Sequence, residues 1–131
     1  MVSRRAAKSK GSQFEMDCAY SLKKVYSDII RLGSEGFQMQ FDLQSDAEEA
    51  VFECKRLKGL SWNQLVKLYD KLIDVTPTAQ KRYILFQSNR QPCLVFYETS
   101  DDDCWEFKIK EFESVFGVPF EKHPSTRVKK K

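Results

Sequence analysis

The sequence has very little of what several kinds of active site require. Its 131 residues include one histidine, His123, close to the end. Catalytic pairs of serine or cysteine with histidine, and metal sites built on several imidazoles, therefore have almost nothing to use. The four cysteines, Cys18, Cys54, Cys93 and Cys104, form no Cys-x-x-Cys pair. This disfavours a disulfide framework and a zinc knuckle, and we expect free thiols in a reducing, cytoplasmic compartment.

Long apolar runs are also missing. No stretch approaches the ~20 apolar residues of a membrane-spanning helix, so we expect no membrane partner. The basic start, residues 1–10, has no apolar segment behind it and predicts no secretory signal. A hydrophobic content of 41% supports one packed core in a chain of this length. We expect a single domain over residues 1–131, with basic flexible tails at about 1–9 and 122–131.

Positive charge is concentrated at the two ends of the chain, although the net charge is only +3. The basic residues form two groups, Arg4, Arg5, Lys8 and Lys10 at the start and Arg127, Lys129, Lys130 and Lys131 at the end. Such tails suit a polyanionic partner, because each neutralised phosphate releases a counterion. They also suit simple solubility, so the tails alone decide little.

Hydrophobic periodicity predicts an α/β chain in the order α-β-β-β-α-β-β. A first amphipathic helix is expected over about residues 11–29. A second follows Ser61, where Ser61 and Gln64 fit a capping box, and ends before Pro77, with Trp62 and the leucine stripe in the core. Strands are expected at residues 28–32, 37–43, 50–55, 82–87 and 93–98, with room for an edge strand at 104–108 and a short helix at 110–116. A mixed central sheet flanked by helices follows.

Three charged residues gather on the hairpin predicted from strands 37–43 and 50–55. Glu53 and Lys55 share one face of a strand, since alternate side chains point the same way, and pairing brings Asp42 alongside them. Charges buried without partners are costly, and a divalent cation would explain the group. Magnesium prefers oxygen ligands and takes few carboxylates, so Asp42, Glu53 and a backbone carbonyl near Cys54 would suit it. Lys55 would then stabilise charge on a phosphate under attack.

Two further observations leave alternatives open. The turn between these strands carries Asp46, Glu48 and Glu49, which are rival carboxylates, although a solvated turn explains them more simply. On the first helix, Ser12 and Glu15 have the spacing of a capping box. Spacing alone favours that structural role for Glu15.

Together these motifs resemble the PD-(D/E)xK nuclease superfamily. The pattern Asp42 … Glu53-Cys54-Lys55 is similar to its catalytic signature. The stretch from Lys10 to Glu15, Lys-Gly-Ser-Gln-Phe-Glu, is similar to the Lys-Gly-x-x-Phe-Glu that opens the first helix of archaeal and phage-type Holliday junction resolvases. The resemblance covers roughly residues 8–98 and implies a restriction-endonuclease-like sheet. It also implies that Glu15 belongs to the metal site and is not a helix cap.

Other positions bear on the same resemblance. Arg31-Leu-Gly-Ser34 stands where the resolvases have a strand arginine and a Gly/Ser loop, which implies that Ser34 contacts DNA near the cut. The chain departs from the family at Phe41, where a proline is usual. Gln64 and Tyr69 are five residues apart, so the Gln-x-x-x-Tyr of exonuclease-like relatives is absent. That difference favours the resolvase branch.

The resemblance implies a Mg²⁺-dependent endonuclease, with Mn²⁺ as a substitute, that acts as a homodimer on branched or duplex DNA and resolves Holliday junctions. Its catalytic residues would be Glu15, Asp42, Glu53 and Lys55, and its metal ligands Glu15, Asp42, Glu53 and the Cys54 carbonyl. The expected DNA contacts are Arg4, Arg5, Lys8, Lys10, Arg31, Ser34, Arg56 and Lys58. Two alternatives remain: another PD-(D/E)xK endonuclease (nicking, flap or restriction-like), and a non-catalytic nucleic-acid-binding module.

Overall fold

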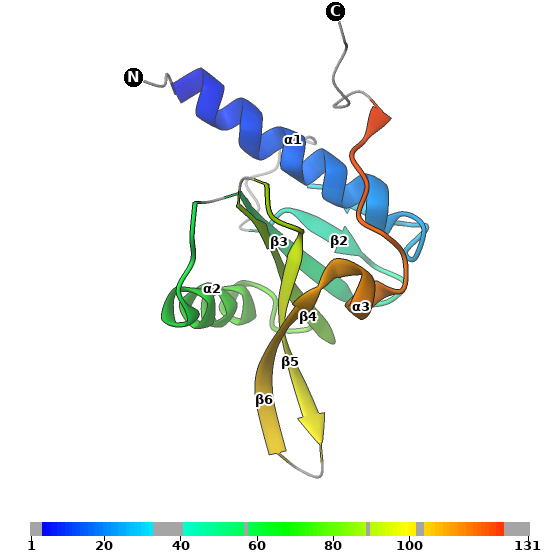
Figure 1. The fold of residues 1–131 in the computed structure, drawn as a ribbon. Coiled ribbons are helices and arrows are strands. Elements are labelled where there is room, and N and C mark those ends of the chain that lie inside the picture. The colour runs from blue at the N-terminus through cyan, green and yellow to red at the C-terminus, as the bar shows by residue number, and fades with distance from the viewer. Residues whose placement is uncertain (1–3, 33–40, 57, 89, 102–103, 125–131) are drawn as a thin grey trace, which may run out of the picture.

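A mixed sheet of six strands forms the middle layer of the computed structural model, which describes residues 4–32, 41–56, 58–88, 90–101 and 104–124 (Figure 1). Of residues 4–12 and 101 only the backbone is described. In chain order the elements are α1 (Arg4–Leu22), β1 (Ile30–Arg31), β2 (Leu43–Ser45), β3 (Ala50–Arg56), α2 (Trp62–Val75), β4 (Lys81–Gln87), β5 (Leu94–Asp101), β6 (Cys104–Glu111) and α3 (Phe112–Phe116).

The strands lie side by side in the order β1 to β6; among these described strands β3 and β4 run parallel, and the other neighbours run antiparallel. That parallel pair requires a crossover, which α2 supplies. The predicted α/β class, a mixed central sheet flanked by helices in the order α-β-β-β-α-β-β, is confirmed, with β6 and α3 following it.

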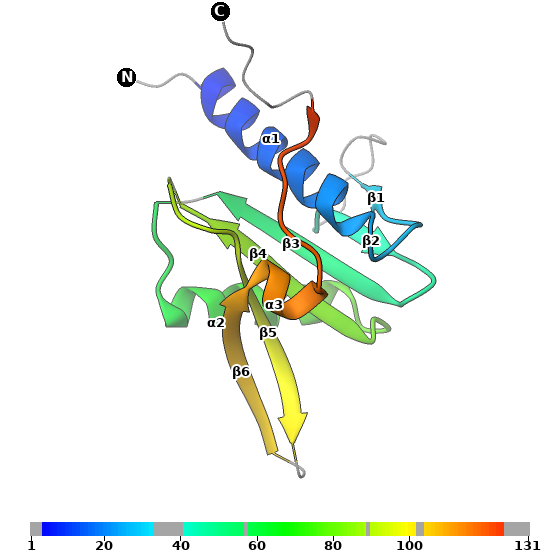
Figure 2. The same ribbon diagram turned by 45° about the vertical axis from the view of Figure 1, so that its right-hand side comes forward.

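Helices cover both faces of the sheet (Figures 1 and 2). We call these the α1 face, which α3 also covers, and the α2 face. Strand β3 shows how alternation divides the core: Phe52 and Cys54 pack on the α1 face with Phe14, whereas Val51 packs on the α2 face with Leu65. Because both faces are buried, β3 is a central strand, and its polar residues must be held by specific partners.

Helix α2 begins as its sequence predicts. The Ser61 hydroxyl accepts the Gln64 N–H at 3.2 Å, and the Gln64 side chain accepts the Ser61 N–H at 2.8 Å, which completes a capping box. The helix ends at Val75, before Pro77. Trp62, expected in the core, is instead 48% exposed, because it lies in the first turn of the helix. Its ring makes edge contacts with Phe96 and Phe107, at 5.3 and 6.4 Å between centroids.

Of the boundaries that differ from those expected, two bear on the predicted site. Helix α1 runs from Arg4 to Leu22, not over residues 11–29, so Ser12 lies inside the helix and not at its start. After Leu22 the chain turns, and Tyr26 and Ile29 reach the core from the loop. Their spacing imitates a continued helix, but Val25, predicted on the same stripe, is 40% exposed.

The second difference concerns the first strand of the hairpin. It was predicted over residues 37–43, of which 37–40 lie outside the described residues. Strand β2 is Leu43–Ser45, so Asp42 stands immediately before it. The hairpin itself is confirmed, because β2 and β3 pair antiparallel with Leu43 opposite Phe52.

Residues 120–123, the C-terminal strap, run back along α1. The Ser21 hydroxyl donates to the Glu121 carbonyl at 2.9 Å and accepts the Glu121 N–H at 2.8 Å. The His123 N–H donates to the buried Asp17 carboxylate at 2.9 Å. Helix α1 is therefore held between the sheet and the strap. None of the helices in the described ranges is both long and apolar enough to cross a bilayer.

The capping box gives a test of the fold. Replacing Ser61 with Ala leaves the Gln64 N–H without its acceptor, so we expect a loss of about 1 kcal/mol in the free energy of unfolding. Urea unfolding followed by far-UV circular dichroism measures it. Asn63→Ala, at an exposed position two residues on, should stay within about 0.5 kcal/mol of the parent; an equal loss in both variants would exclude the cap as the cause.

Candidate functional site

Asp42 lies at the centre of the predicted site, where β2 begins. Its backbone joins two strands: the Asp42 N–H donates to Phe52 at 3.1 Å, and the Asp42 carbonyl accepts from Leu32 at 3.0 Å. Its side-chain Oδ2 accepts the Cys54 N–H at 2.7 Å. The carboxylate therefore occupies the place beside β3 that a longer β2 would fill with its own backbone.

Glu53 and Lys55 approach from β3. Alternation along β3 places both on the same face, which is the α2 face because Val51 packs there, and the Lys55 Nζ lies 3.3 Å from Glu53 Oε2. The Glu53 side chain is only 15% exposed. Burial, and next the negative charge of Asp42, raise the pKa of Glu53 to about 7, while Lys55 acts in the opposite direction.

Glu15 approaches from α1, on the other face of the sheet. Burial is the largest cause that raises its pKa, and the charge of Asp42 is the second. Arg31 of β1 acts the other way, with its Nη2 3.3 Å from Glu15 Oε1. The structure thus brings Arg31, expected as a DNA contact, beside a carboxylate of the site.

The arrangement is a carboxylate cluster: Asp42 interacts with Glu15 on one side and with Glu53 on the other. Arg31 and Lys55 flank the cluster and offset part of its negative charge. The raised pKa values of both glutamates show that this compensation is incomplete. A bound cation would complete it.

The donor chemistry fits Mg²⁺. Across 4–32, 41–56, 58–88, 90–101 and 104–124, no three or more His, Cys, Asp and Glu side chains stand ready to hold a metal ion. Mg²⁺ does not require three, because it usually takes one or two carboxylates and keeps water or phosphate for the rest. Asp42 and Glu53 would supply the carboxylates. The Cys54 carbonyl faces the same side of β3 as the N–H bound to Asp42, since both groups of one strand residue point the same way.

The remaining predicted residues lie around or outside this cluster. Arg56 ends β3 and Lys58 is exposed just beyond it. Arg4, Arg5, Lys8 and Lys10 lie in the first turns of α1, where side chains are not described, and Ser34 lies outside the described residues. Their expected contacts with DNA stay predictions.

The rival carboxylates belong to a different part of the surface. Asp46, Glu48 and Glu49 are exposed in the turn before β3, at the opposite end of that strand from Lys55. Glu48 pairs with Lys81 at 3.3 Å. The simpler interpretation, a solvated turn, agrees with this exposure.

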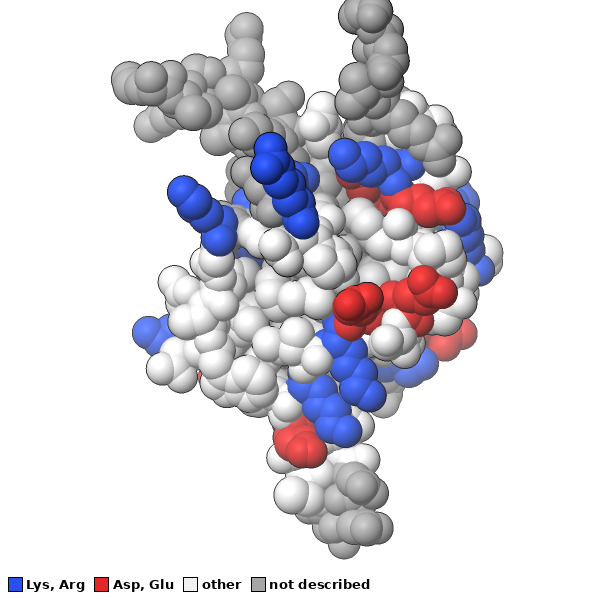
Figure 3. All heavy atoms as spheres, viewed as in Figure 1, with Lys and Arg blue, Asp and Glu red and all other residues white. Residues whose placement is uncertain are grey.

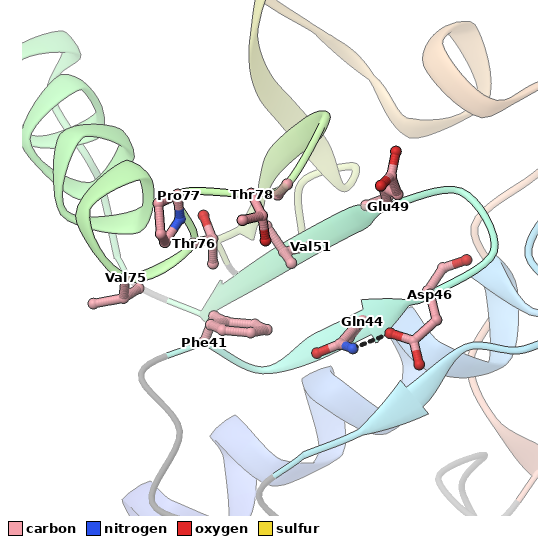
Figure 4. Close-up of a pocket in the computed structure, with 12 residues that line it drawn as sticks. Phe41, Gln44, Asp46, Glu49, Val51, Val75, Thr76, Pro77 and Thr78 are labelled. Atoms are coloured by element: carbon pink, nitrogen blue, oxygen red, sulfur yellow. Dashed lines mark hydrogen bonds between the residues drawn. The ribbon is translucent and has the colours of Figure 1, made fainter.

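A cavity of about 330 Å³ opens beside that turn (Figure 4). Phe41, Gln44 and Glu49 line one side, and Thr76 and Pro77 the other. None of the four predicted catalytic side chains lines it. The cavity is therefore separate from the carboxylate cluster and does not enter the chemistry considered for it.

Comparison with known proteins adds a structural likeness. No protein-family model matches the chain, and no curated protein matches it in sequence. Among solved structures it is similar to Hjc of Archaeoglobus fulgidus, a Holliday junction resolvase from an archaeal hyperthermophile. The match has 18% identity and a TM-score of 0.48, and covers 86% of this chain and 99% of that one. A likeness of this size carries no argument about activity, which must come from the residues.

The raised pKa of Glu53 predicts that the free energy of unfolding of the metal-free protein depends on pH. Between its ordinary value of 4.5 and about 7 the unfolded chain binds fewer protons at this site than the folded chain. Stability therefore falls as the pH rises through this window and stays lower above it. We expect Glu53→Gln to increase the free energy of unfolding by roughly 1–3 kcal/mol at pH 8 and to change it little at pH 4.

Chemical unfolding with a chelator present measures this effect at both pH values. Asp70→Asn, on the exposed side of α2, is the matched control and should leave stability nearly unchanged at either pH. A Glu53→Gln protein less stable than the parent at pH 8 would contradict the proposed electrostatic cost.

Proposed function

We propose that the chain is a Mg²⁺-dependent endonuclease that hydrolyses phosphodiester bonds in branched DNA, with Holliday junctions as the preferred substrate and a homodimer as the active form. The observation that carries the proposal is the carboxylate cluster with Lys55 at its edge. Glu15, Asp42 and Glu53 come from three separate segments, and each glutamate interacts with Asp42, which contributes to its raised pKa. The resemblance to the PD-(D/E)xK nucleases assigns catalysis to these same residues.

The roles of the residues follow from their positions. Asp42, Glu53 and the Cys54 carbonyl would hold Mg²⁺, with Glu15 adjoining them. When bound, Mg²⁺ supplies a water of lowered pKa and polarises the phosphate. Lys55 is then free to donate to a phosphate oxygen or to the attacking water, and its positive charge stabilises the charge that develops in the transition state. Arg31 keeps Glu15 oriented toward Asp42.

The setting proposed for this chemistry is the cytoplasm, or the nucleoid or a host cell if the source is viral. All four cysteines are free thiols, and three of them are buried, which agrees with a reducing compartment. Arg56, Lys58 and the basic start of α1 would contact phosphates. Such contacts set affinity and read no bases, as suits an enzyme that recognises DNA shape.

The direct test is cleavage of a synthetic four-way junction in Mg²⁺. We expect Lys55→Ala and Asp42→Asn each to reduce the rate by about 10²-fold or more, because each removes a group that acts on the reacting phosphate or its metal. Gel-shift assays should show junction binding within a few-fold of the parent. Lys81→Ala, a cation at the far end of β4, is the control and should cut normally.

The substrate is tested by comparing a four-way junction, a flap and a linear duplex at equal concentration. Preferred cutting of the junction supports the resolvase assignment, and preferred cutting of the flap or the duplex replaces it with another nuclease of this chemistry. Junction binding without cleavage of any substrate would instead identify a non-catalytic module.

Metal binding has a readout that does not depend on cleavage. Protons and Mg²⁺ compete for Glu53, whose pKa is about 7, so we expect Mg²⁺ to raise the melting temperature more at pH 8 than at pH 6. The shift should disappear in Asp42→Asn. An equal shift at both pH values, or one that survives in that variant, would place the ion elsewhere.

A further inference from the structure

Strand β6 leaves one edge of the sheet open. It is the last strand in the sheet order, and no strand in the described ranges pairs with its outer side. The β5–β6 hairpin projects from the body of the molecule, and β6 forms one of its margins (Figures 1 and 2). An eight-residue edge with unpaired backbone groups is a template for another strand.

The register shows which residues offer those groups. The Phe112 N–H donates to the Cys93 carbonyl at 3.0 Å, and the same register continues without a bulge from Glu111 to Cys104. Since backbone groups alternate along an antiparallel ladder, the even-numbered residues of β6 face β5. The odd-numbered residues, Trp105, Phe107, Ile109 and Glu111, therefore present their N–H and C=O groups to the open edge.

The side chains of β6 divide into an apolar and a charged face. On the α2 face, Phe107 stacks on Phe96 at 4.9 Å between ring centroids. Beside it Trp105 is 67% exposed and Ile109 is 38% exposed, so two large apolar side chains flank Phe107 at the surface of the same strand. The other face carries Glu106, Lys108 and Lys110, and Figure 3 shows acidic and basic side chains in turn along the front of the hairpin.

We infer that β6 pairs antiparallel with β6 of a second copy of this chain, with the two-fold axis at Phe107. Around this axis Glu106 lies opposite Lys108 of the other copy, twice over, and Trp105 lies opposite Ile109. Every charge pair at the centre is attractive, and the exposed apolar residues cover one another. The contact is isologous and extends both sheets into one.

The charges select this register over its neighbours. Outward-facing residues must pair with outward-facing residues, so the two nearest alternative registers place the axis at Glu106 or at Lys108. The first shift places Glu106 opposite Glu106, and the second places Lys108 opposite Lys108. Like charges directly opposite each other are destabilising, so of these three registers the axis at Phe107 is the one that satisfies both faces.

This inference supplies the interface of the homodimer in the proposed function, and in that respect it rests on the proposed function. The evidence for the interface, however, comes from β6 alone. Its test measures mass and not cleavage. A failed interface therefore leaves the nuclease proposal standing, and an inactive but dimeric protein leaves the interface standing.

The test is a charge exchange followed by sedimentation velocity over a range of concentrations. Glu106→Lys and Lys108→Glu each create two repulsive pairs in place of two attractive ones, so each should raise the dimer dissociation constant about tenfold or more. The double variant restores opposite charges in exchanged positions and should return to within about threefold of the parent. Lys110→Glu is the control, because Lys110 lies opposite Cys104 in this register and should matter much less.

A monomeric parent at all concentrations overturns the inference, and so does a double variant no better than the single variants. A second variant tests the backbone pairing. Ile109→Pro removes an outward N–H that β5 does not use, so the monomer should keep its circular dichroism while the dimer weakens about tenfold or more. A folded Ile109→Pro protein with an unchanged dissociation constant also overturns the inference. If this variant does not fold, the charge exchange decides alone.

Discussion

The hydrogen bond from the Cys54 N–H to the Asp42 carboxylate fixes the most important charge in the molecule. In this hydrogen bond a side chain takes the place of a backbone acceptor from a neighbouring strand. The carboxylate therefore lies at the sheet margin and not on either face. From that margin it interacts with Glu15, which comes from above one face, and with Glu53, which points from the other. A carboxylate on a regular strand residue would meet only one of them. Strand β2 begins only at Leu43, opposite Phe52, while β3 continues to Arg56, and this difference in length is what allows Asp42 to interact with both glutamates.

Convergence has an electrostatic cost that the fold only partly offsets. Arg31 contacts Glu15, and Lys55 contacts Glu53. In the described part of the chain, the ion pairs away from this cluster are exposed, such as that between Lys24 and Glu121 at 2.6 Å. Proteins tolerate uncompensated charge mainly where it serves a function, and a site that holds a cation is one such place. The residues expected to reduce the stability of the metal-free protein would then be the residues that bind the ion.

Much of the fold could be predicted because its signals are local. The alternation along β3 and the Ser61 capping box both follow from residues close in sequence, and both are confirmed. The end of α1 could not be predicted, since Tyr26 and Ile29 keep helical spacing while they reach the core from a loop. The pairing of Glu15 with Arg31 was also beyond sequence, because it depends on how α1 lies across β1. In the site, the closeness of Asp42 and Glu53 could be predicted from hairpin pairing. That Glu15 belongs to the same site could be predicted only from the family resemblance.

The C-terminal strap has a consequence for the order of events during synthesis. Helix α1 carries Glu15 and is made well before the groups that hold its outer side, around Glu121 and His123. While the chain is still on the ribosome, α1 can rest on the sheet with Ser21 and Asp17 turned to solvent and their backbone partners absent. The outer side of the helix that carries Glu15 is covered only after the strap emerges and closes over it. Support for this helix is in this way tied to synthesis of the strap, so a chain that stops before Glu121 carries the motif without the contacts that hold α1 from outside.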